Sequence, residues 1–156
     1  MMNAIKQQLI LHCNELLEKR LQVAQVAIKS IEEAFASETK SSAGDKHETG
    51  RAMLQLEREK AGERLKDAET MLYTFHKIRF DAPSSEEKNE IVKIGNLVKT
   101  TNGIYFIATS LGVVTMDNTT VYCVSAQAPI GKLLLGKSTQ SEFSFQQKNI
   151  QILEIY

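Results

Sequence analysis

The chain of 156 residues contains no tryptophan, only two prolines and two cysteines, and few aromatic residues. Two cysteines are too few for the disulfide framework of a small secreted domain, so we expect Cys13 and Cys123 to be reduced thiols. No apolar run approaches the roughly 20 residues of a membrane span, and the first residues lack the apolar core of a secretory signal. These absences predict a soluble, cytoplasmic protein.

Neither sign of charge dominates. The 19 basic and 19 acidic side chains balance, so no overall field favours nucleic acid as a direct partner. The sequence also lacks a recognisable Cys–His or Ser–His–Asp arrangement for acyl transfer. We therefore do not expect an enzyme that acts alone.

The composition changes near residue 80, which favours two domains. Residues 1–80 are charged and follow a helical period, whereas β-branched residues and Gly/Asn turns dominate residues 91–156. Residues 81–90 begin with Asp-Ala-Pro-Ser-Ser, which is typical of a linker. The sequence thus predicts an α+β protein with a helical N-terminal domain and a β-rich C-terminal domain.

Two hydrophobic repeats occupy the N-terminal domain. After one skipped position, which makes the first step of each repeat seven residues, their spacings alternate between four and three, as in the seam of a coiled coil. The first repeat comprises Ile10, Leu17, Leu21, Ala24, Ile28, Ile31 and Phe35, and the second comprises Leu54, Ala61, Leu65, Ala68, Leu72 and Phe75. A reversal within Ser41-Ser42-Ala43-Gly44 would pair Ile31 with Leu54 and Ala24 with Ala61. We therefore expect a long antiparallel coiled-coil hairpin over residues 1–80, with arms on the order of 50 Å.

The tip of this hairpin, near residues 44–48, carries Asp45 and Glu48. Two carboxylates three residues apart at a helix start lie on one face and can share a hard cation such as Mg²⁺, with water completing its shell. The same Asp-x-x-Glu spacing is also that of a capping box, which begins many helices that have no catalytic role. Both interpretations stay open at this point.

The C-terminal domain is predicted to be a compact antiparallel sheet with one short helix. Asn-Gly and Asp-Asn steps supply hairpin turns, and the proline at 129 can open a helix that Gly136 closes. The expected strands are residues 91–100, 104–109, 112–116, 121–125, 142–145 and 150–156. The spelling from Gly131 to Ser138 matches a phosphate loop, but three leucines fill the positions that should expose backbone amides, so we expect no nucleotide site.

Two segments resemble the bacterial Gre transcript-cleavage factors. Gly44-Asp45-Lys46-His47-Glu48 is similar to the Gly-Asp-x-x-Glu element of that family. The stretch from Ser125 to Lys137, Ser-Ala-Gln-Ala-Pro-Ile-Gly-Lys-Leu-Leu-Leu-Gly-Lys, is similar to the family segment Ser-Pro-Leu-Gly-Arg-Ala-Leu-Leu-Gly-Lys. The resemblance covers most of the chain, and it implies an FKBP-like fold for residues 91–156.

The resemblance also implies a function in transcription elongation. In the family, the coiled coil enters the secondary channel of RNA polymerase and stimulates cleavage of backtracked RNA by the polymerase. Asp45 and Glu48 would help to retain a Mg²⁺ shared with the polymerase active site and would orient the attacking water. Lys46 and Arg51 would contact RNA phosphate or channel carboxylates. The partners are RNA polymerase and the 3′ end of the nascent RNA, and the chain would be an accessory factor.

Residues in the C-terminal domain would bind the polymerase at the channel rim. The resemblance places this contact on the segment that contains Pro129, Lys132 and Lys137. An FKBP-like fold also suggests prolyl isomerisation, but the C-terminal half has no tryptophan and few aromatic residues to line such a pocket.

Two other functions stay open. The family usually continues after the acidic tip with Asn-Ala-Glu-Tyr, whereas this chain has Thr49-Gly50-Arg51-Ala52. This departure suggests a regulator or inhibitor that occupies the secondary channel without stimulating cleavage. The third possibility is a coiled-coil interaction protein with no affinity for polymerase. The sequence does not indicate the oligomeric state.

Overall fold

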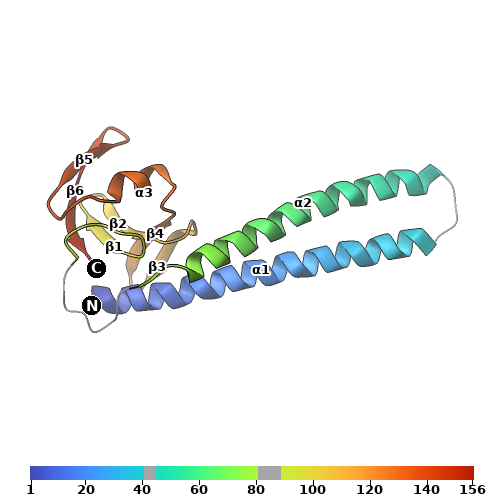
Figure 1. Cartoon of the computed structure of the whole chain (residues 1–156), viewed down its shortest axis with the longest axis horizontal. Coiled ribbons are helices and arrows are strands. Elements are labelled where there is room, and N and C mark those ends of the chain that lie inside the picture. Colours follow the sequence, from blue (N-terminus) through green and yellow to red (C-terminus); the bar gives the residue numbers. More distant parts are fainter. Residues whose placement is uncertain (41–44, 81–88) are drawn as a thin grey trace. The chain divides into compact units, whose positions relative to one another are not determined.

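The structure, a computed structural model, describes the backbone of residues 1–40, 45–80 and 89–156, with the side chains of these residues except 39, 40 and 45–47. Two long helices come first, α1 (Met2–Lys40) and α2 (Asp45–His76). Six strands and one short helix follow (Figure 1). The α+β class predicted from the sequence is therefore confirmed. The predicted reversal at 41–44 lies outside the described residues, as does most of the predicted linker at 81–90.

The chain divides into two compact units, and the division does not coincide with the change in composition. One unit combines residues Met1–Cys13 with Phe75–Tyr156, and the other consists of Asn14–Thr74. The first residues of α1 and the last residues of α2 therefore belong to the same unit as the sheet. In the described part of the chain, no helix is long and apolar enough to cross a membrane.

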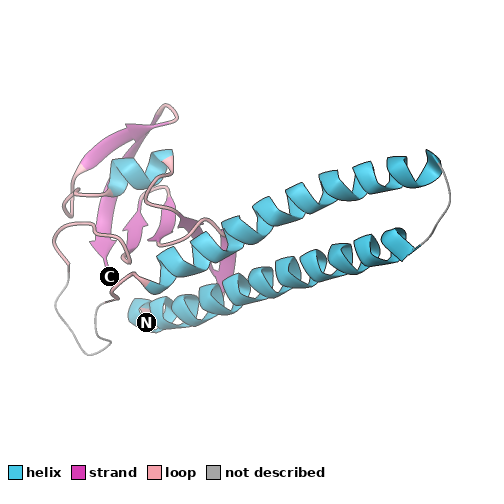
Figure 2. Cartoon of the chain, turned by 45° about the vertical axis from the view of Figure 1, so that its right-hand side comes forward, coloured by secondary structure: helices cyan, strands magenta, loops and turns pink. Residues whose placement is uncertain are grey.

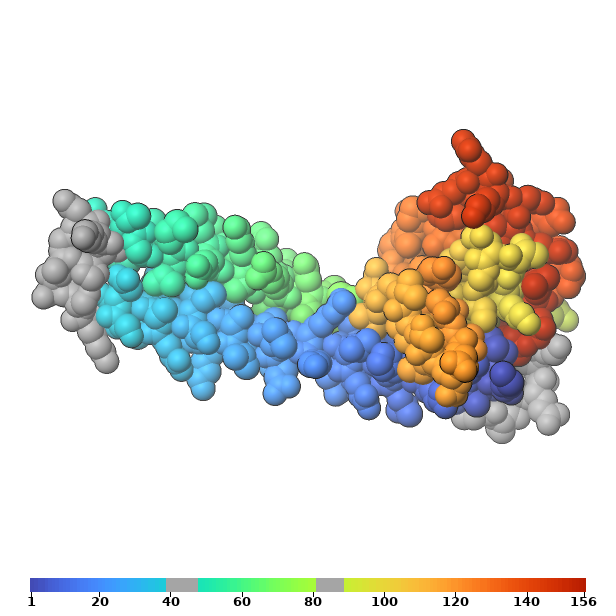
Figure 3. All heavy atoms as spheres, turned by 180° about the vertical axis from the view of Figure 1, so that it is seen from behind, coloured from blue at the N-terminus to red at the C-terminus, as the bar shows by residue number. Residues whose placement is uncertain are grey.

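Within the unit of residues 14–74, α1 and α2 run side by side in opposite directions (Figures 1 and 2). The guanidinium of Arg58 lies 5.8 Å from the centre of the Phe35 ring, a cation–π contact between the two helices. Nearer the other end, Nη1 of Arg20 lies 4.0 Å from Sδ of Met71. Atoms of the two helices lie against one another along this unit (Figure 3).

The apolar repeats account for which side of each helix is buried. Ala24, Ala61 and Ala68 are buried, and the other members of the two repeats are buried or half-buried. Apolar residues off the repeats, such as Val23 and Leu56, are exposed. Small alanine side chains at the contact allow two helix backbones to approach closely, so burial follows the repeat rather than hydrophobicity alone.

The β-rich region forms one six-stranded sheet in the order β3-β4-β2-β1-β6-β5. Its strands are β1 (Leu97–Thr100), β2 (Gly103–Ile107), β3 (Gly112–Met116), β4 (Thr119–Val124), β5 (Glu142–Phe145) and β6 (Lys148–Ile155). The predicted bounds of β3 and β5 are confirmed. The first predicted strand is too long, because β1 begins at Leu97 and Ile91 makes only an isolated bridge with Ser138.

The prediction of a wholly antiparallel sheet is wrong at one pair of strands. β2 and β4 are parallel, with Tyr105 opposite Tyr122, so the sheet is mixed. After β2 the chain passes one position in the sheet and forms β3 at the edge. It then turns back at Asp117 and Asn118 and places β4 between β3 and β2. Both turn residues have positive φ, of 47° and 61°, as a tight two-residue hairpin requires.

The two faces of the sheet have separate apolar partners. On one face, the short helix α3 (Pro129–Leu134) contributes Ile130 and Leu134 to a core that includes Val98, Tyr105, Ile107, Ile152 and Ile155. On the other face, the ring of Phe80 lies 6.1 Å from Phe106 of β2 and 5.7 Å from Phe75 of α2. Cys13 of α1 and Cys123 of β4 are also buried in this unit. The helix termini thus complete the core of this unit.

Candidate functional site

The acidic end of the unit formed by residues 14–74 was the predicted site. α2 begins at Asp45, so the predicted acidic pair falls in its first turn. The carboxylate of Glu48 is exposed, and so is the guanidinium of Arg51, three residues further along the same helix. The side chains of Asp45 and Lys46 lie outside the described residues, and so does any capping contact between Asp45 and the helix start.

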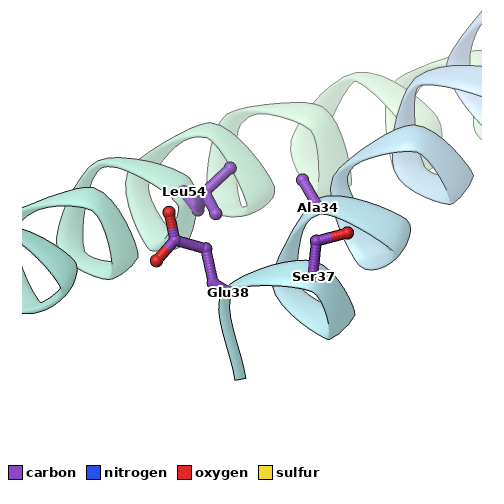
Figure 4. Close-up of a pocket in the computed structure, with 4 residues that line it drawn as sticks. All are labelled: Ala34, Ser37, Glu38 and Leu54. Atoms are coloured by element: carbon purple, nitrogen blue, oxygen red, sulfur yellow. The ribbon is translucent and has the colours of Figure 1, made fainter. Parts of the chain in front are cut away.

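Glu38 of α1 approaches α2 at Gly50. Its Oε1 lies 3.0 Å from the position that a Cβ on Gly50 of α2 would occupy. This approach is possible because residue 50 has no side chain. The carboxylate of Glu38 reaches from α1 towards α2 beside Leu54 (Figure 4).

A pocket of about 480 Å³ lies beside this contact, lined by Ala34, Ser37, Glu38 and Leu54. Three of these residues come from α1 and one from α2 (Figure 4). The lining offers one carboxylate and one hydroxyl among apolar groups. The lining contains no histidine, cysteine or lysine, and the pocket by itself supports binding better than covalent chemistry.

Glu38 of α1 approaches one side of α2, and Glu48 projects from the other side of α2. Successive residues of an α-helix are about 100° apart, so Glu48 is about 200° from Gly50, the position that faces Glu38. The exposed Glu48 therefore projects away from α1, whereas the half-buried Glu38 lies between the helices. Among the described residues, no three His, Cys, Asp or Glu side chains are grouped closely enough to hold a metal ion. The carboxylates of this region do not make a closed metal cage from described side chains.

The three predicted C-terminal contact residues lie in the other unit, in and after α3. Pro129 is the first residue of that helix and is exposed, as is Lys132, while Lys137 is half-buried. The backbone oxygen of Lys137 accepts a hydrogen bond from the amide of Val92 at 2.9 Å. The structure thus supplies two candidate contact regions, each in its own unit.

Gly131, the first glycine of the apparent phosphate-loop spelling, packs closely against the backbone of residue 125. This residue is buried within α3, and a Cβ there would lie 2.2 Å from the backbone oxygen of Ser125. The carbonyl of Gly131 accepts a hydrogen bond from the amide of Leu135 at 3.0 Å. The glycine serves close packing of the helix.

The position of Glu38 was not predicted from the sequence. The two repeats pair residue 31 with 54 and residue 24 with 61, so the same rule places residue 38 opposite residue 47 and not opposite Gly50. Glu38 is also a charged residue outside the apolar repeat, so it carried no signal of its own.

Searches of protein-family models, of curated proteins and of solved structures return no match to this chain.

Proposed function

We propose that this chain is a Gre-like transcription elongation factor. In this proposal it binds RNA polymerase, inserts the end of the helix pair that carries Asp45 and Glu48 through the secondary channel, and stimulates Mg²⁺-dependent cleavage of backtracked RNA. The observation that carries the proposal is the exposed carboxylate of Glu48 in the first turn of a 32-residue helix. A carboxylate that projects away from its own protein is available to complete a site on another.

The proposal includes a finer description of both parts of the fold. We propose that α1 and α2 form an antiparallel coiled-coil hairpin; the cation–π contact between Phe35 and Arg58 and the buried alanines along the repeats support it. We also propose that the sheet with α3 is an FKBP-like domain. The support is a single short helix between β4 and β5 whose Ile130 and Leu134 pack in the core over one face.

The donor chemistry at the tip fits a weakly held Mg²⁺. Carboxylate oxygens are the ligands that this ion prefers, and Mg²⁺ keeps several waters when a protein supplies only one or two of them. Asp45 and Glu48 would hold the ion together with groups of the polymerase. When bound, Mg²⁺ supplies electrostatic stabilisation to the oxygens of the scissile phosphodiester.

The chain's own residues have further roles in the proposal. The Glu48 carboxylate accepts a hydrogen bond from the attacking water and orients it. The exposed guanidinium of Arg51, together with Lys46, binds phosphate oxygens of the RNA or carboxylates of the channel. In the other unit, Pro129, Lys132 and Lys137 contact the polymerase and anchor the factor.

The test is an RNA cleavage assay on backtracked elongation complexes from the same source, with Mg²⁺. We expect the wild-type chain to accelerate trimming of the RNA 3′ end, and Asp45→Asn or Glu48→Gln to abolish this while polymerase binding persists. Glu63→Gln is the matched control, because Glu63 is an exposed carboxylate of the same helix far from its start. Unchanged cleavage with both tip variants would refute the assignment of the tip.

Anchoring through α3 has its own test. Lys132→Ala should weaken polymerase binding several-fold, whereas Lys148→Ala, an equally exposed lysine at the start of β6, should not. Equal affinity of the two variants would remove α3 from the interface.

A second candidate is a secondary-channel regulator that does not stimulate cleavage. Gly50 favours it, because this residue lies where the sequence departs from the Gre pattern and admits the Glu38 carboxylate to the helix interface. If the protein binds polymerase and inhibits transcription initiation but does not stimulate RNA cleavage, this second candidate is the function. No affinity for polymerase would reject both and leave a coiled-coil interaction protein.

A further inference from the structure

Strand β3 is an edge of the sheet, because within residues 89–156 only β4 pairs with it. The two strands are joined by a two-residue turn, 117–118, in which both residues have positive φ. In such a hairpin the flanking residues, here Met116 and Thr119, form a hydrogen-bonded pair, and non-hydrogen-bonded and hydrogen-bonded pairs then alternate along the strands. The main-chain N–H and C=O groups of Val113 and Thr115 therefore point away from β4.

These outward groups are accessible. Val113 is 60% exposed, and Thr115 is exposed as well. Within the described ranges, no backbone hydrogen bond from a turn or loop reaches either residue. The ring of Tyr122, which is opposite Val113 on β4, leans towards β2: it stacks on Tyr105 at 5.5 Å, and its Cε2 lies 3.1 Å from the position of a Cβ on Gly103. The edge thus presents two donors and two acceptors that no other described backbone segment covers.

β3 also lacks the features that protect an edge strand from pairing. Natural sheets protect their edges with charged side chains, proline or β-bulges. The sequence of β3, Gly-Val-Val-Thr-Met, has no charged residue and no proline, and its register with β4 runs without a shift. The opposite edge strand, β5, begins with the exposed Glu142. Of the two edges, β3 is the one whose sequence permits another strand to add.

The outward groups of β3 are self-complementary. When a second β3 approaches antiparallel about a two-fold axis at Val114, Val113 of each copy lies opposite Thr115 of the other. Each of these two pairs exchanges two hydrogen bonds, so all the outward donors and acceptors of both strands are satisfied. No like charges meet, because the strand has none. A second β3 is already a formed strand, whereas an unstructured peptide would lose conformational freedom on pairing, so a second copy is the occupant that fits this edge.

We propose that this chain forms a symmetric dimer in which the β3 strands of two copies pair antiparallel and make their sheets continuous. The dimer requires no polymerase, so it is independent of the proposed role in transcription. Two-fold pairing uses the β3 edge of both copies, so association stops at two chains. The contact consists of one short strand from each copy, below the roughly 1,200 Å² that stable interfaces bury, so the dimer is weak and depends on concentration.

The experiment is sedimentation velocity on the full chain from micromolar to millimolar concentration. We expect the sedimentation coefficient to rise from that of a monomer to that of a dimer and no further. Amide hydrogen exchange followed by NMR over the same range locates the contact. The amides of Val113 and Thr115 should become protected as the dimer forms, whereas the amide of Ser144 on β5 should not change.

Two proline variants make the same change on the two edges. Residues 146–147 form the two-residue turn between β5 and β6, so by the same alternation the N–H of Ser144 points away from β6. Proline is tolerated where an edge N–H faces outward, so Thr115→Pro and Ser144→Pro should both keep the native circular dichroism spectrum. Thr115→Pro removes two of the four intermolecular bonds and should raise the dissociation constant of the dimer at least about tenfold. Ser144→Pro should leave it unchanged.

Four results would overturn the proposal. The first is a monomer at every concentration, which would leave the edge free for a peptide of another protein. The second is a dimer that Thr115→Pro does not weaken, as expected if the long helices associate instead. The others are an equal loss of affinity in Ser144→Pro, and protection at high concentration that falls on residues outside β3. If Thr115→Pro fails to fold, the exchange of the wild-type amides still decides the question.

Discussion

Replacing Gly50 with alanine tests the contact that joins the two long helices near the predicted tip. The matched change is Gly62→Ala, in the same helix, where an added Cβ meets no atom within 4 Å. At Gly50 the same Cβ would lie 3.0 Å from Oε1 and 3.6 Å from Cδ of Glu38. The two variants therefore make the same chemical change and differ in one neighbour.

The expected magnitudes follow from two opposing effects. Alanine stabilises a helix interior by about 0.5–1 kcal/mol relative to glycine, so Gly62→Ala should raise the free energy of unfolding by that amount. In Gly50→Ala, the Glu38 side chain must rotate away from its position, which costs about 0.5–1.5 kcal/mol when a side chain moves some 30° off its rotamer. We therefore expect the effect of Gly50→Ala to lie between about 0.5 kcal/mol stabilising and about 1 kcal/mol destabilising, and this variant to be less stable than Gly62→Ala by about 0.5–1.5 kcal/mol.

Urea unfolding followed by far-UV circular dichroism measures both changes, and a double-mutant cycle isolates the contact. In a Glu38→Ala background the obstacle is gone, so Gly50→Ala should there become as stabilising as Gly62→Ala. Two equal gains in the wild-type background would show that the Glu38 carboxylate does not lie against residue 50. The structural account of this end of the helix pair would then be wrong.

Three further changes test the β-rich unit by the same unfolding measurement. Gly131→Ala should lower stability by about 1–3 kcal/mol or more, because its Cβ would lie 2.2 Å from the backbone oxygen of Ser125, which cannot swing aside; a neutral result would contradict the packing of α3. Phe106→Ala should lower the free energy of unfolding by about 3–5 kcal/mol, since this ring is 0% exposed and stacks on Phe80. A loss no larger than that of an exposed residue would contradict the packing of Phe106 against Phe80. Gln147→Gly should raise the free energy of unfolding by roughly 1 kcal/mol, because residue 147 has a φ of 65°, in the left-handed region that glycine adopts without strain. A destabilised variant would show that residue 147 does not have this conformation.

Local patterns predicted the helices and most of the strands correctly, for a physical reason. Apolar residues at alternating spacings of four and three specify one face of a helix, and that face is the buried one in both α1 and α2. The Asp-Asn step between β3 and β4 predicted a tight hairpin, and both residues have positive φ. The Gln146-Gln147 turn gave no such signal, because glutamine is not a usual residue in the left-handed region.

The order of strands in the sheet was not accessible in the same way. Turn residues specify which consecutive strands form a hairpin, and β3 with β4 obeyed this rule. Whether β3 or β4 then pairs with β2 depends on packing across the whole sheet. The sequence of a single strand does not specify that packing. The parallel pairing of Ile104 with Val121 therefore results from tertiary packing and not from local sequence.

The candidate site shows the same limit. The sequence predicted that α2 starts near Asp45, and the helix bounds agree. Glu48 is exposed, and its role as a tip carboxylate stays a prediction. Glu38 was missed because a polar residue at a helix interface has no periodic signature. Its position depends on the absence of a side chain at Gly50, a property of the partner helix rather than of its own surroundings in the sequence.

Cys13 makes the limit most explicit. Its place near an apolar repeat predicted a small buried residue, and it is 0% exposed. A boundary drawn from composition put it in a different part of the protein from Cys123, because composition records which local structure a segment prefers and not what it packs against. α1 is shared between the two units: its residues up to Cys13 belong to the unit that contains the sheet, and its residues from Asn14 belong to the unit that contains most of α2. A change in composition near residue 80 carries no information about this division, which falls within one continuous helix. The unit to which Cys13 belongs is therefore a result of tertiary packing.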